Sequence, residues 1–344
     1  MEYIGIDVHK NQSQVCILTE SGEMVEKRIR TERKRFDEVL GGRAKAKVLI
    51  EASTESEWVA RCLEELGHEV IVGDPNYAPM YAERSRRVKT DRRDARALAT
   101  ACRLGAYRPA YRTSDEQRHV RGLLSVREAL VRTRVRYISL VRALLRKQGY
   151  QLRSGVAYTF IRRVEEVEIP PELREEIAPL MRVMANLNEE ITTSNRDLAR
   201  QSKLDERVER LMSALGVGVL TATSFVATVD RVERFDSAHQ LESYLGLVPR
   251  EWSSAEKQQR GAITKQGNGR MRWLLVEAAW SILRDDDIEG ASLRRWAQRI
   301  EARRGKRVAV VALARRLAGI LYAMWRDGKE YEARLVGEKG CRAA

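Results

Sequence analysis

Apolar and polar positions in the first hundred residues follow a pattern of short strands and amphipathic helices. Three segments rich in β-branched residues predict strands at Tyr3–Val8, Ser13–Thr19 and Met24–Ile29, joined as a meander. The spacing that follows predicts a polar helix, a buried strand, an amphipathic helix and a short strand, over Thr31–Leu40, Lys47–Ile50, Glu55–Leu66 and Glu69–Val72. This order is typical of a mixed sheet with flanking helices and fits a ribonuclease-H-like fold.

Two long helices are predicted in the middle of the chain. Between His119 and Gln148 the apolar residues Leu124, Val131, Ile138 and Leu145 recur every seventh position, and arginines fill the other faces. After Pro170 and Pro171, a second stretch places apolar residues at alternating steps of three and four, at Ile177, Leu180, Met184, Leu187, Ile191 and Leu198. It resembles a coiled-coil strand. Pairing between chains and pairing within one chain as a helical hairpin are both open.

A second globular unit is predicted beyond Leu204. It is mostly helical, punctuated by glycines, and ends in a helix over Arg303–Arg326. The expected class is therefore α/β plus α, with an α/β N-terminal domain, long coiled-coil helices and a mainly helical C-terminal domain. The expected boundaries are 1–110, 111–204 and 205–330, followed by a charged tail over 331–344.

Charge is concentrated in one part of the chain. The 344 residues carry a net charge of +14, but Arg84 to Arg163 alone hold 22 Lys and Arg against 5 Asp and Glu. Arginine forks match phosphate oxygens, and binding to nucleic acid releases counterions. Nucleic acid is therefore the expected partner, rather than an anionic membrane surface or solvent alone. The helical arginines expected to bind it are Arg132, Arg136, Arg142 and Arg146.

Cysteines and histidines give no sign of a zinc site or a disulfide framework. The four cysteines and four histidines are scattered, without a CxxC pair. The N-terminus runs straight into a strand, and no uninterrupted apolar run approaches membrane-spanning length. We therefore expect a folded cytoplasmic protein with no membrane partner.

Four N-terminal carboxylates are candidate metal ligands. Asp7 and Glu51 end apolar strands, and Asp91 and Asp94 lie three residues apart at a predicted helix start. Clustered carboxylates repel one another unless divalent cations neutralise them, and oxygen ligands favour Mg²⁺ or Mn²⁺. Two such ions about 4 Å apart can hold the attacking and leaving oxygens of a phosphodiester. The structural alternative is that Asp91 caps its helix while Asp94 pairs with Arg87 or Arg96.

A serine pair near the C-terminus is the second candidate for chemistry. Ser253 and Ser254 follow Pro249 in what is predicted to be a loop, and a glycine-rich segment comes next. A serine hydroxyl becomes a nucleophile when a base or a metal counters its charge. Most such serines are ordinary loop hydroxyls. Nearby cations are candidates for holding a phosphate, at Lys257, Arg260, Lys265 and Arg270.

Two glycines mark a third motif. Gly216 and Gly218 lie between two helical stretches within Leu211–Val229, as in a helix-hairpin-helix. Such glycines let backbone N–H groups meet a DNA phosphate without reading sequence. A tight helical turn is an equally good explanation.

Both sets of motifs resemble one family, in the same order along nearly the whole chain. Gly5-Ile6-Asp7-Val8-His9-Lys10, Ile50-Glu51-Ala52-Ser53 and Lys89-Thr90-Asp91-x-x-Asp94-Ala95 resemble the motifs of the DEDD transposases of the insertion-sequence-110 family. The segment from Tyr244 to Asn268 resembles that family's C-terminal domain, whose catalytic serine follows the proline after four intervening residues and is here Ser254. That serine is commonly followed by glycine, but here by Ala255, which leaves Ser253 as a weaker candidate.

The resemblance implies a function that composition does not show. It implies an insertion-sequence transposase that cuts and rejoins double-stranded donor and target DNA, with Mg²⁺ on Asp7, Glu51, Asp91 and Asp94 in a domain like the Holliday-junction resolvase RuvC. Ser254 would form a transient phosphoserine linkage. A structured noncoding bridge RNA and a homo-oligomer, a dimer assembling to a tetramer with composite sites, are further implied.

Two other functions fit the same residues. One is a metal-dependent RuvC-like or ribonuclease-H-like nuclease that uses water and leaves the serine structural. The other is a non-enzymatic, basic coiled-coil protein that binds nucleic acid.

Overall fold

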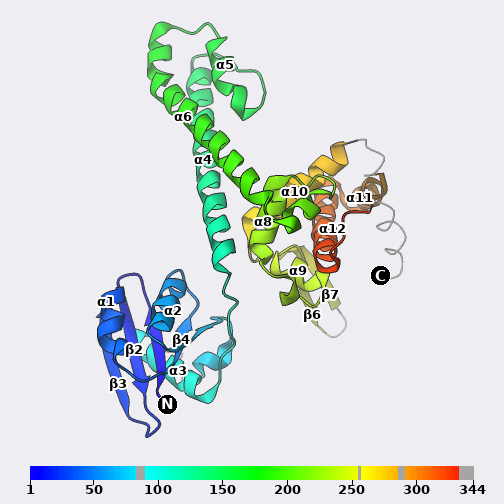
Figure 1. The fold of residues 1–344 in the computed structure, drawn as a ribbon. Coiled ribbons are helices and arrows are strands. Elements are labelled where there is room, and N and C mark those ends of the chain that lie inside the picture. Colours follow the sequence, from blue (N-terminus) through cyan, green and yellow to red (C-terminus); the bar gives the residue numbers. More distant parts are fainter. Residues whose placement is uncertain (83–89, 255–256, 286–290, 333–344) are drawn as a thin grey trace. The chain divides into compact units, whose positions relative to one another are not determined.

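The computed structural model describes residues 1–82, 90–254, 257–285 and 291–332, without the side chains of residues 253, 254, 257, 258 and 260. The chain divides into two compact units, Met1–Thr113 and Ser114–Ala344 (Figure 1). The finer predicted division into 1–110, 111–204, 205–330 and 331–344 stays a prediction.

A mixed five-stranded sheet forms the centre of the first unit. Its strands are β1 (Tyr3–Val8), β2 (Gln12–Leu18), β3 (Met24–Arg30), β4 (Lys47–Glu51) and β5 (Glu69–Gly73), in the order β3-β2-β1-β4-β5. Strands β1, β2 and β3 pair antiparallel, whereas β4 runs parallel to β1 and β5 parallel to β4. The predicted meander and mixed sheet are confirmed, and the strand bounds differ from the prediction by at most one residue.

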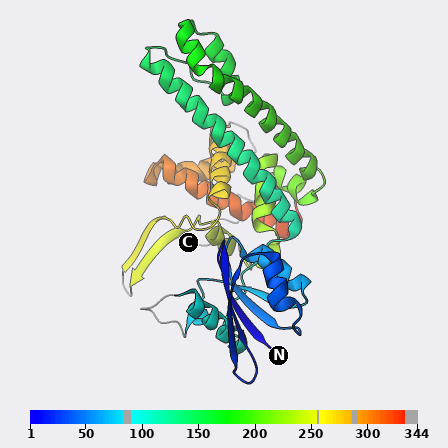
Figure 2. The same cartoon turned by 90° about the vertical axis from the view of Figure 1, so that its left-hand side faces the viewer.

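Alternation along β1 sends its side chains to two different layers. Ile4 and Ile6 pack in a core with Phe36 of α1 (Arg33–Phe36) and Leu63 of α2 (Ser56–Glu65). The opposite face of the sheet is covered by α3 (Asp91–Leu104), so helices lie on both sides (Figure 2). The helix predicted over Thr31–Leu40 is α1 continued by a π-helical turn, Asp37–Gly41. A 3-10 turn at Ala78–Tyr81 completes the described part of this unit.

Gly5 lets α3 lie unusually close to β1. A β-carbon at Gly5 would stand 2.2 Å from the carbonyl oxygen of Ala95 and 2.2 Å from the amide nitrogen of Ala99. Any side chain larger than hydrogen would therefore push the helix away from the sheet. This close approach matters because Asp7, on the same face of β1, points toward the first turn of α3.

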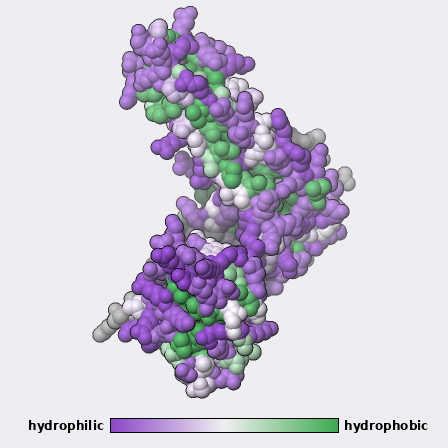
Figure 3. All heavy atoms as spheres, turned by 60° about the vertical axis from the view of Figure 1, so that its left-hand side comes forward, coloured by the Kyte–Doolittle hydropathy of each residue, from purple (hydrophilic) through white to green (hydrophobic). Residues whose placement is uncertain are grey.

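The second unit begins with a hairpin of two long helices, α4 (Asp115–Lys147) and α6 (Pro171–Ser202), connected through a 3-10 turn at Ala157–Thr159 and α5 (Phe160–Glu165). Val141 and Leu145 of α4 share a core with Ile177 and Met184 of α6. The heptads thus pack within one chain, which is one of the two predicted alternatives. Exposed apolar side chains also line the hairpin, and Figure 3 shows apolar atoms running along it. They include Val126, Val135, Leu140 and Val183.

The rest of the second unit is a helical core with one β-hairpin. Its helices are α7 (Glu206–Met212), α8 (Val219–Val229), α9 (Ala238–Tyr244), α10 (Gly269–Arg284), α11 (Ala291–Arg304) and α12 (Lys306–Asp327), with a 3-10 turn at Val232–Arg234. The predicted helix over Arg303–Arg326 is wrong at its start, because Gly305, at φ 82°, separates α11 from α12. The hairpin consists of β6 (Pro249–Ser254) and β7 (Lys257–Ile263).

Helix α12 is the one described helix with the length and apolar composition to cross a membrane. Half of its apolar window is buried in the protein, and Leu313, Leu317 and Leu321 belong to the core of the second unit. A core helix has the same composition, so this feature is weak evidence for a membrane span.

Candidate active site

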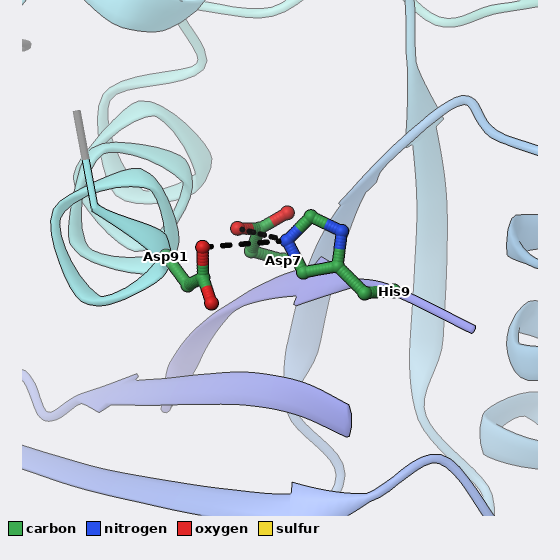
Figure 4. Close-up of side chains that lie close together, drawn as sticks. All are labelled: Asp7, His9 and Asp91. Carbon is green, nitrogen blue, oxygen red and sulfur yellow. Dashed lines mark ion pairs between the residues drawn. The ribbon is translucent and has the colours of Figure 1, made fainter. Parts of the chain in front are cut away.

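Three side chains meet where β1 ends and α3 begins. The Nε2 atom of His9 lies 3.2 Å from Oδ2 of Asp7 and 3.5 Å from Oδ1 of Asp91. Figure 4 shows the imidazole with this nitrogen turned toward both carboxylates. Asp7 is 8% exposed, whereas half of the Asp91 side chain is open to solvent. The cluster therefore has one buried acid and one open side.

The two other predicted acids surround the same point. The parallel register pairs Ile6 with Ile50, so Glu51 is the next residue beside Asp7 at the sheet edge. Asp94 is buried in the first turn of α3. The pKa of Asp7 is raised above its ordinary 3.8, first by burial and then by the negative charges of Asp94, Asp91 and Glu51, while His9 opposes the shift. The three other predicted acids therefore all act on Asp7.

The start of α3 is fixed by groups other than these acids. Thr90 caps the helix, since its hydroxyl accepts a hydrogen bond from the Arg93 amide at 3.3 Å. The alternative role of Asp91 as the cap is therefore wrong, because Thr90 already occupies the extended position that precedes the helix. Arg96 pairs with Glu26 of β3 at 2.5 Å, and Arg92 also donates to Glu26 at 2.5 Å. Two arginines thus tie α3 to the sheet.

The donor set suits a divalent cation. Asp7, His9 and Asp91 each offer one ligand atom, and these atoms lie within 4.8 Å of one another. Two carboxylate oxygens and one imidazole nitrogen fit the coordination chemistry of Mn²⁺, and the oxygens that of Mg²⁺. A cation would also offset the repulsion that raises the pKa of Asp7.

Sequence reasoning missed His9 as part of this site. It was counted among scattered histidines without a metal-binding spacing. The available signal was its position two residues after Asp7, because residues i and i+2 of an extended segment point to the same side.

Ser254, the predicted nucleophile, is the last residue of β6, and its backbone pairs with Lys257. The prediction of a loop at Ser253 and Ser254 is wrong, because both belong to a strand whose ladder with β7 supplies the backbone hydrogen bonds. The side chains of Ser253, Ser254, Lys257 and Arg260 lie outside the described residues, as do Arg87 and Ala255.

Some of the arginines predicted to bind nucleic acid are exposed, and others contact an acidic or aromatic side chain of the protein. Arg132, Arg136 and Arg146 are exposed on α4, and Arg132 also pairs with Glu128 at 2.7 Å. Arg270 also reaches Glu128, at 2.8 Å, and its guanidinium lies 4.2 Å from the centre of the Trp273 ring. Arg142 is half-buried, over the ring of Phe160 at 5.8 Å.

The predicted glycine motif forms the turn before α8. Gly216 has φ 70°, and a β-carbon there would stand 2.6 Å from the carbonyl oxygen of Ala278 in α10. This contact supports the tight helical turn, one of the two alternatives. Gly218 is the open N-cap of α8, and Lys265 adopts φ 58° after the hairpin.

Comparison with known proteins places this geometry in a family. A model described as "Transposase", of the DEDD type, matches residues 4–148, which include all four acids. A second, described as "Transposase IS116/IS110/IS902 family", matches residues 208–291, which include Ser254. The chain is 31% identical over 287 residues to a "Probable family 20 transposase" of Pseudomonas aeruginosa, covering 80% of this chain and 83% of that protein.

Two further relatives are similar along almost the entire chain. The transposase of the insertion element IS1111A from Coxiella burnetii is 29% identical over 94% of this chain and 89% of its own length. The transposase of IS1328 from Yersinia enterocolitica is 27% identical over 94% of this chain and 97% of its own length. Fold, acids and relatives together define an enzyme that cuts and rejoins DNA. The chain belongs to the IS110/IS116/IS902 family of insertion-sequence transposases.

Proposed function

We propose that this transposase recombines double-stranded donor and target DNA with two sets of residues. Asp7, Glu51, Asp91 and Asp94 hold Mg²⁺, with Mn²⁺ as a substitute, and Ser254 is the nucleophile. The observation that carries the proposal is the meeting of Asp7, His9 and Asp91 within 4.8 Å at the end of β1. The electrostatic influence of Asp94 and Glu51 on Asp7 supports the full acid set.

The first unit is proposed to have a ribonuclease-H-like, RuvC-like fold. Support comes from the strand order β3-β2-β1-β4-β5, with an antiparallel meander followed by two parallel strands. In this arrangement the carboxyl ends of β1 and β4 lie at one sheet edge, where Asp7 and Glu51 reside. Such an edge is a common location for sites in sheets with parallel strands.

The proposed reaction is a pair of ester exchanges. The Ser254 oxygen attacks a phosphorus atom of the DNA and forms a phosphoserine bond, while the displaced DNA oxygen leaves and takes up a proton. A hydroxyl of a second DNA end then attacks the same phosphorus and releases the serine. When bound, a divalent cation would stabilise the negative charge on the exchanging oxygens. Asp7, Asp91 and the other acids would hold it, and His9 offers a further ligand atom beside the first two.

The proposed partners of the protein follow from its positive charge and from the family to which it belongs. The arginines of α4 provide positive charge for nucleic acid, and the resemblance to the insertion-sequence-110 family adds a bridge RNA that selects donor and target. A dimer that assembles to a tetramer, with acids and serine from different protomers in one composite site, completes the proposal. The apolar side chains exposed along α4 and α6 are available for such association.

Covalent trapping tests the serine. The protein, with the RNA that copurifies with it, is incubated with Mg²⁺ and labelled duplex DNA carrying the element end, then separated on a denaturing gel. Wild type and Ser253→Ala are expected to give a protein–DNA adduct, and Ser254→Ala none. Full recombination by Ser254→Ala would overturn the proposal. Cleavage by Ser254→Ala without any adduct in the wild type would instead identify a nuclease that uses water.

Sequencing the copurified nucleic acid tests the RNA partner. One abundant structured RNA is expected, and its removal by ribonuclease is expected to abolish recombination. Recombination that persists after complete ribonuclease digestion would exclude a guide RNA. Activity that survives Asp7→Ala combined with Asp94→Ala would exclude the proposed metal site.

A further inference from the structure

A groove of about 940 Å³ lies in the second unit, beside the hairpin that carries Ser254. One wall comes from the base of the hairpin, with Pro249 and Ile263, and the other from α11 and α12, with Val308 and Val311. Four arginines also line it, and three of them are exposed. They are Arg303, Arg304, Arg307 and Arg315.

The arginines make this groove strongly positive. Arg303, Arg304, Lys306 and Arg307 fall within five consecutive residues, around Gly305, which has φ 82° and separates α11 from α12. The first turn of α12 contains no acidic residue. Only a polyanion complements such a cluster of like charges, and a phosphodiester backbone is the polyanion on which transposases act. Arg315 is held in place by Glu242 at 2.6 Å.

Apolar walls and an exposed aromatic ring indicate which form of nucleic acid fits. Trp252 is 60% exposed and lies against Gly261, a residue that lines the groove. In duplex DNA the faces of the bases are stacked inside the helix, so they cannot reach an aliphatic wall or a tryptophan. A positive groove beside an exposed aromatic ring is typical of sites that bind unpaired strands.

The groove also lies near the proposed nucleophile. Trp252 and Ser254 are two residues apart on β6, a separation of about 7 Å along the backbone of a strand. We propose that the groove binds an unpaired DNA strand next to the phosphate that Ser254 attacks, with one base stacked on Trp252 and the phosphates on Arg304 and Arg307. The position relative to the cut rests on the proposed function; the binding itself does not.

Binding of a short fluorescein-labelled oligothymidylate to the full-length protein tests the proposal. Fluorescence anisotropy is measured over a series of salt concentrations, with a duplex of the same length and an oligouridylate as comparison probes. Trp252→Ala is expected to weaken oligothymidylate binding roughly ten-fold, and Trp252→Phe to restore most of it. Arg304→Gln with Arg307→Gln is expected to lower the slope of log affinity against log salt by roughly 1.4. Arg295→Gln, on the exposed surface of α11 outside the groove, is the matched control.

Several results would overturn the inference. The first is that both groove variants bind oligothymidylate as tightly as the wild type does. The second is that the variants lose as much affinity for the duplex as for oligothymidylate. The third is that they lose affinity for oligouridylate alone. Photo-cross-linking to a bromodeoxyuridine oligonucleotide locates the protein residues that contact the bases. A cross-link outside the tryptic peptide that contains Trp252 would also contradict the inference. Ser254→Ala is expected to bind like wild type. Normal oligonucleotide binding in a protein that forms no serine adduct would therefore refute the proposed chemistry and leave the groove intact.

Discussion

A β-carbon on Gly5 of β1 would lie 2.2 Å from the carbonyl oxygen of Ala95 in α3, so these two residues set the distance between helix and sheet. Asp7 follows Gly5 on the same face of β1, and Asp91 begins α3. The proposed metal site therefore depends on a glycine that is not itself one of the proposed ligands.

Gly5→Ala is expected to destabilise the protein and to weaken metal binding together. Overpacking of this kind costs about 1–3 kcal/mol. Urea unfolding measures the first effect and calorimetric titration with Mn²⁺ the second. Gly122→Ala, in α4, is the control, because nothing lies within 4 Å of its added β-carbon and alanine favours a helix by about 1 kcal/mol. Unchanged Mn²⁺ affinity in Gly5→Ala would show that the position of α3 does not control the site.

Asp7→Asn is expected to abolish Mn²⁺ binding and, without metal, to increase the free energy of unfolding. Burial and three neighbouring acids disfavour the charged form of Asp7, so a neutral amide of the same shape removes a repulsion. Calorimetric titration with Mn²⁺ measures the loss of binding. Urea unfolding in the presence of a chelator measures the stability of the metal-free protein. Glu23→Gln, on an exposed turn, should change neither. Lower stability of metal-free Asp7→Asn would mean that the carboxylate is needed for folding instead.

Glu26→Gln is expected to loosen the first turn of α3 by about 1 kcal/mol, a value limited by the exposure of its two arginine partners. Hydrogen bonds from Arg96 and Arg92 lower the pKa of Glu26 from 4.5 to about 2. Its contribution to stability is therefore present above pH 4.5 and lost as the pH falls through about 2. The stability difference between wild type and Glu26→Gln should shrink over that interval. A difference independent of pH would contradict the ion pair, and Lys27→Gln provides the control.

Asp230→Ala is expected to cost roughly 2–4 kcal/mol in the second unit. The buried Asp230 carboxylate accepts hydrogen bonds from the Ser114 amide at 2.8 Å and the Ser114 hydroxyl at 2.7 Å, which joins the start of α4 to the end of α8. Hydrogen exchange at the first turn of α4 should accelerate in the same variant. Asp230→Asn should retain most of the stability, because asparagine has nearly the same shape and its amide oxygen still accepts a hydrogen bond. Equal losses in both variants would show that charge alone matters.

Local pattern predicted the first unit well, since its strands are short segments rich in β-branched residues and bounded by turns or polar residues. It placed the start of α4 at His119, four residues late, although Ser114 and Gln117 form the S-x-x-Q sequence of a capping box. The link between Glu26 and α3 could not be predicted, because it joins residues about 70 positions apart.

The β6–β7 hairpin was missed for a different reason. Its strands are polar in sequence, with Glu251, Gln258 and Arg260 at paired positions, so the sequence shows no apolar period of two. Backbone pairing defines this element. The acids, in contrast, could be proposed as a group because Asp7 and Glu51 lie near the ends of apolar strands, and Asp91 and Asp94 lie in the first turn of a helix.

All four acids lie within Met1–Thr113, a unit with its own core, whereas the serine belongs to the other unit. A gene copy interrupted between α6 and the β6–β7 hairpin would thus encode the proposed cation ligands and the two long helices without the proposed nucleophile. If protomers share composite sites, such a truncated copy would join intact ones and inactivate them, so decayed elements would restrain the mobility of their functional siblings.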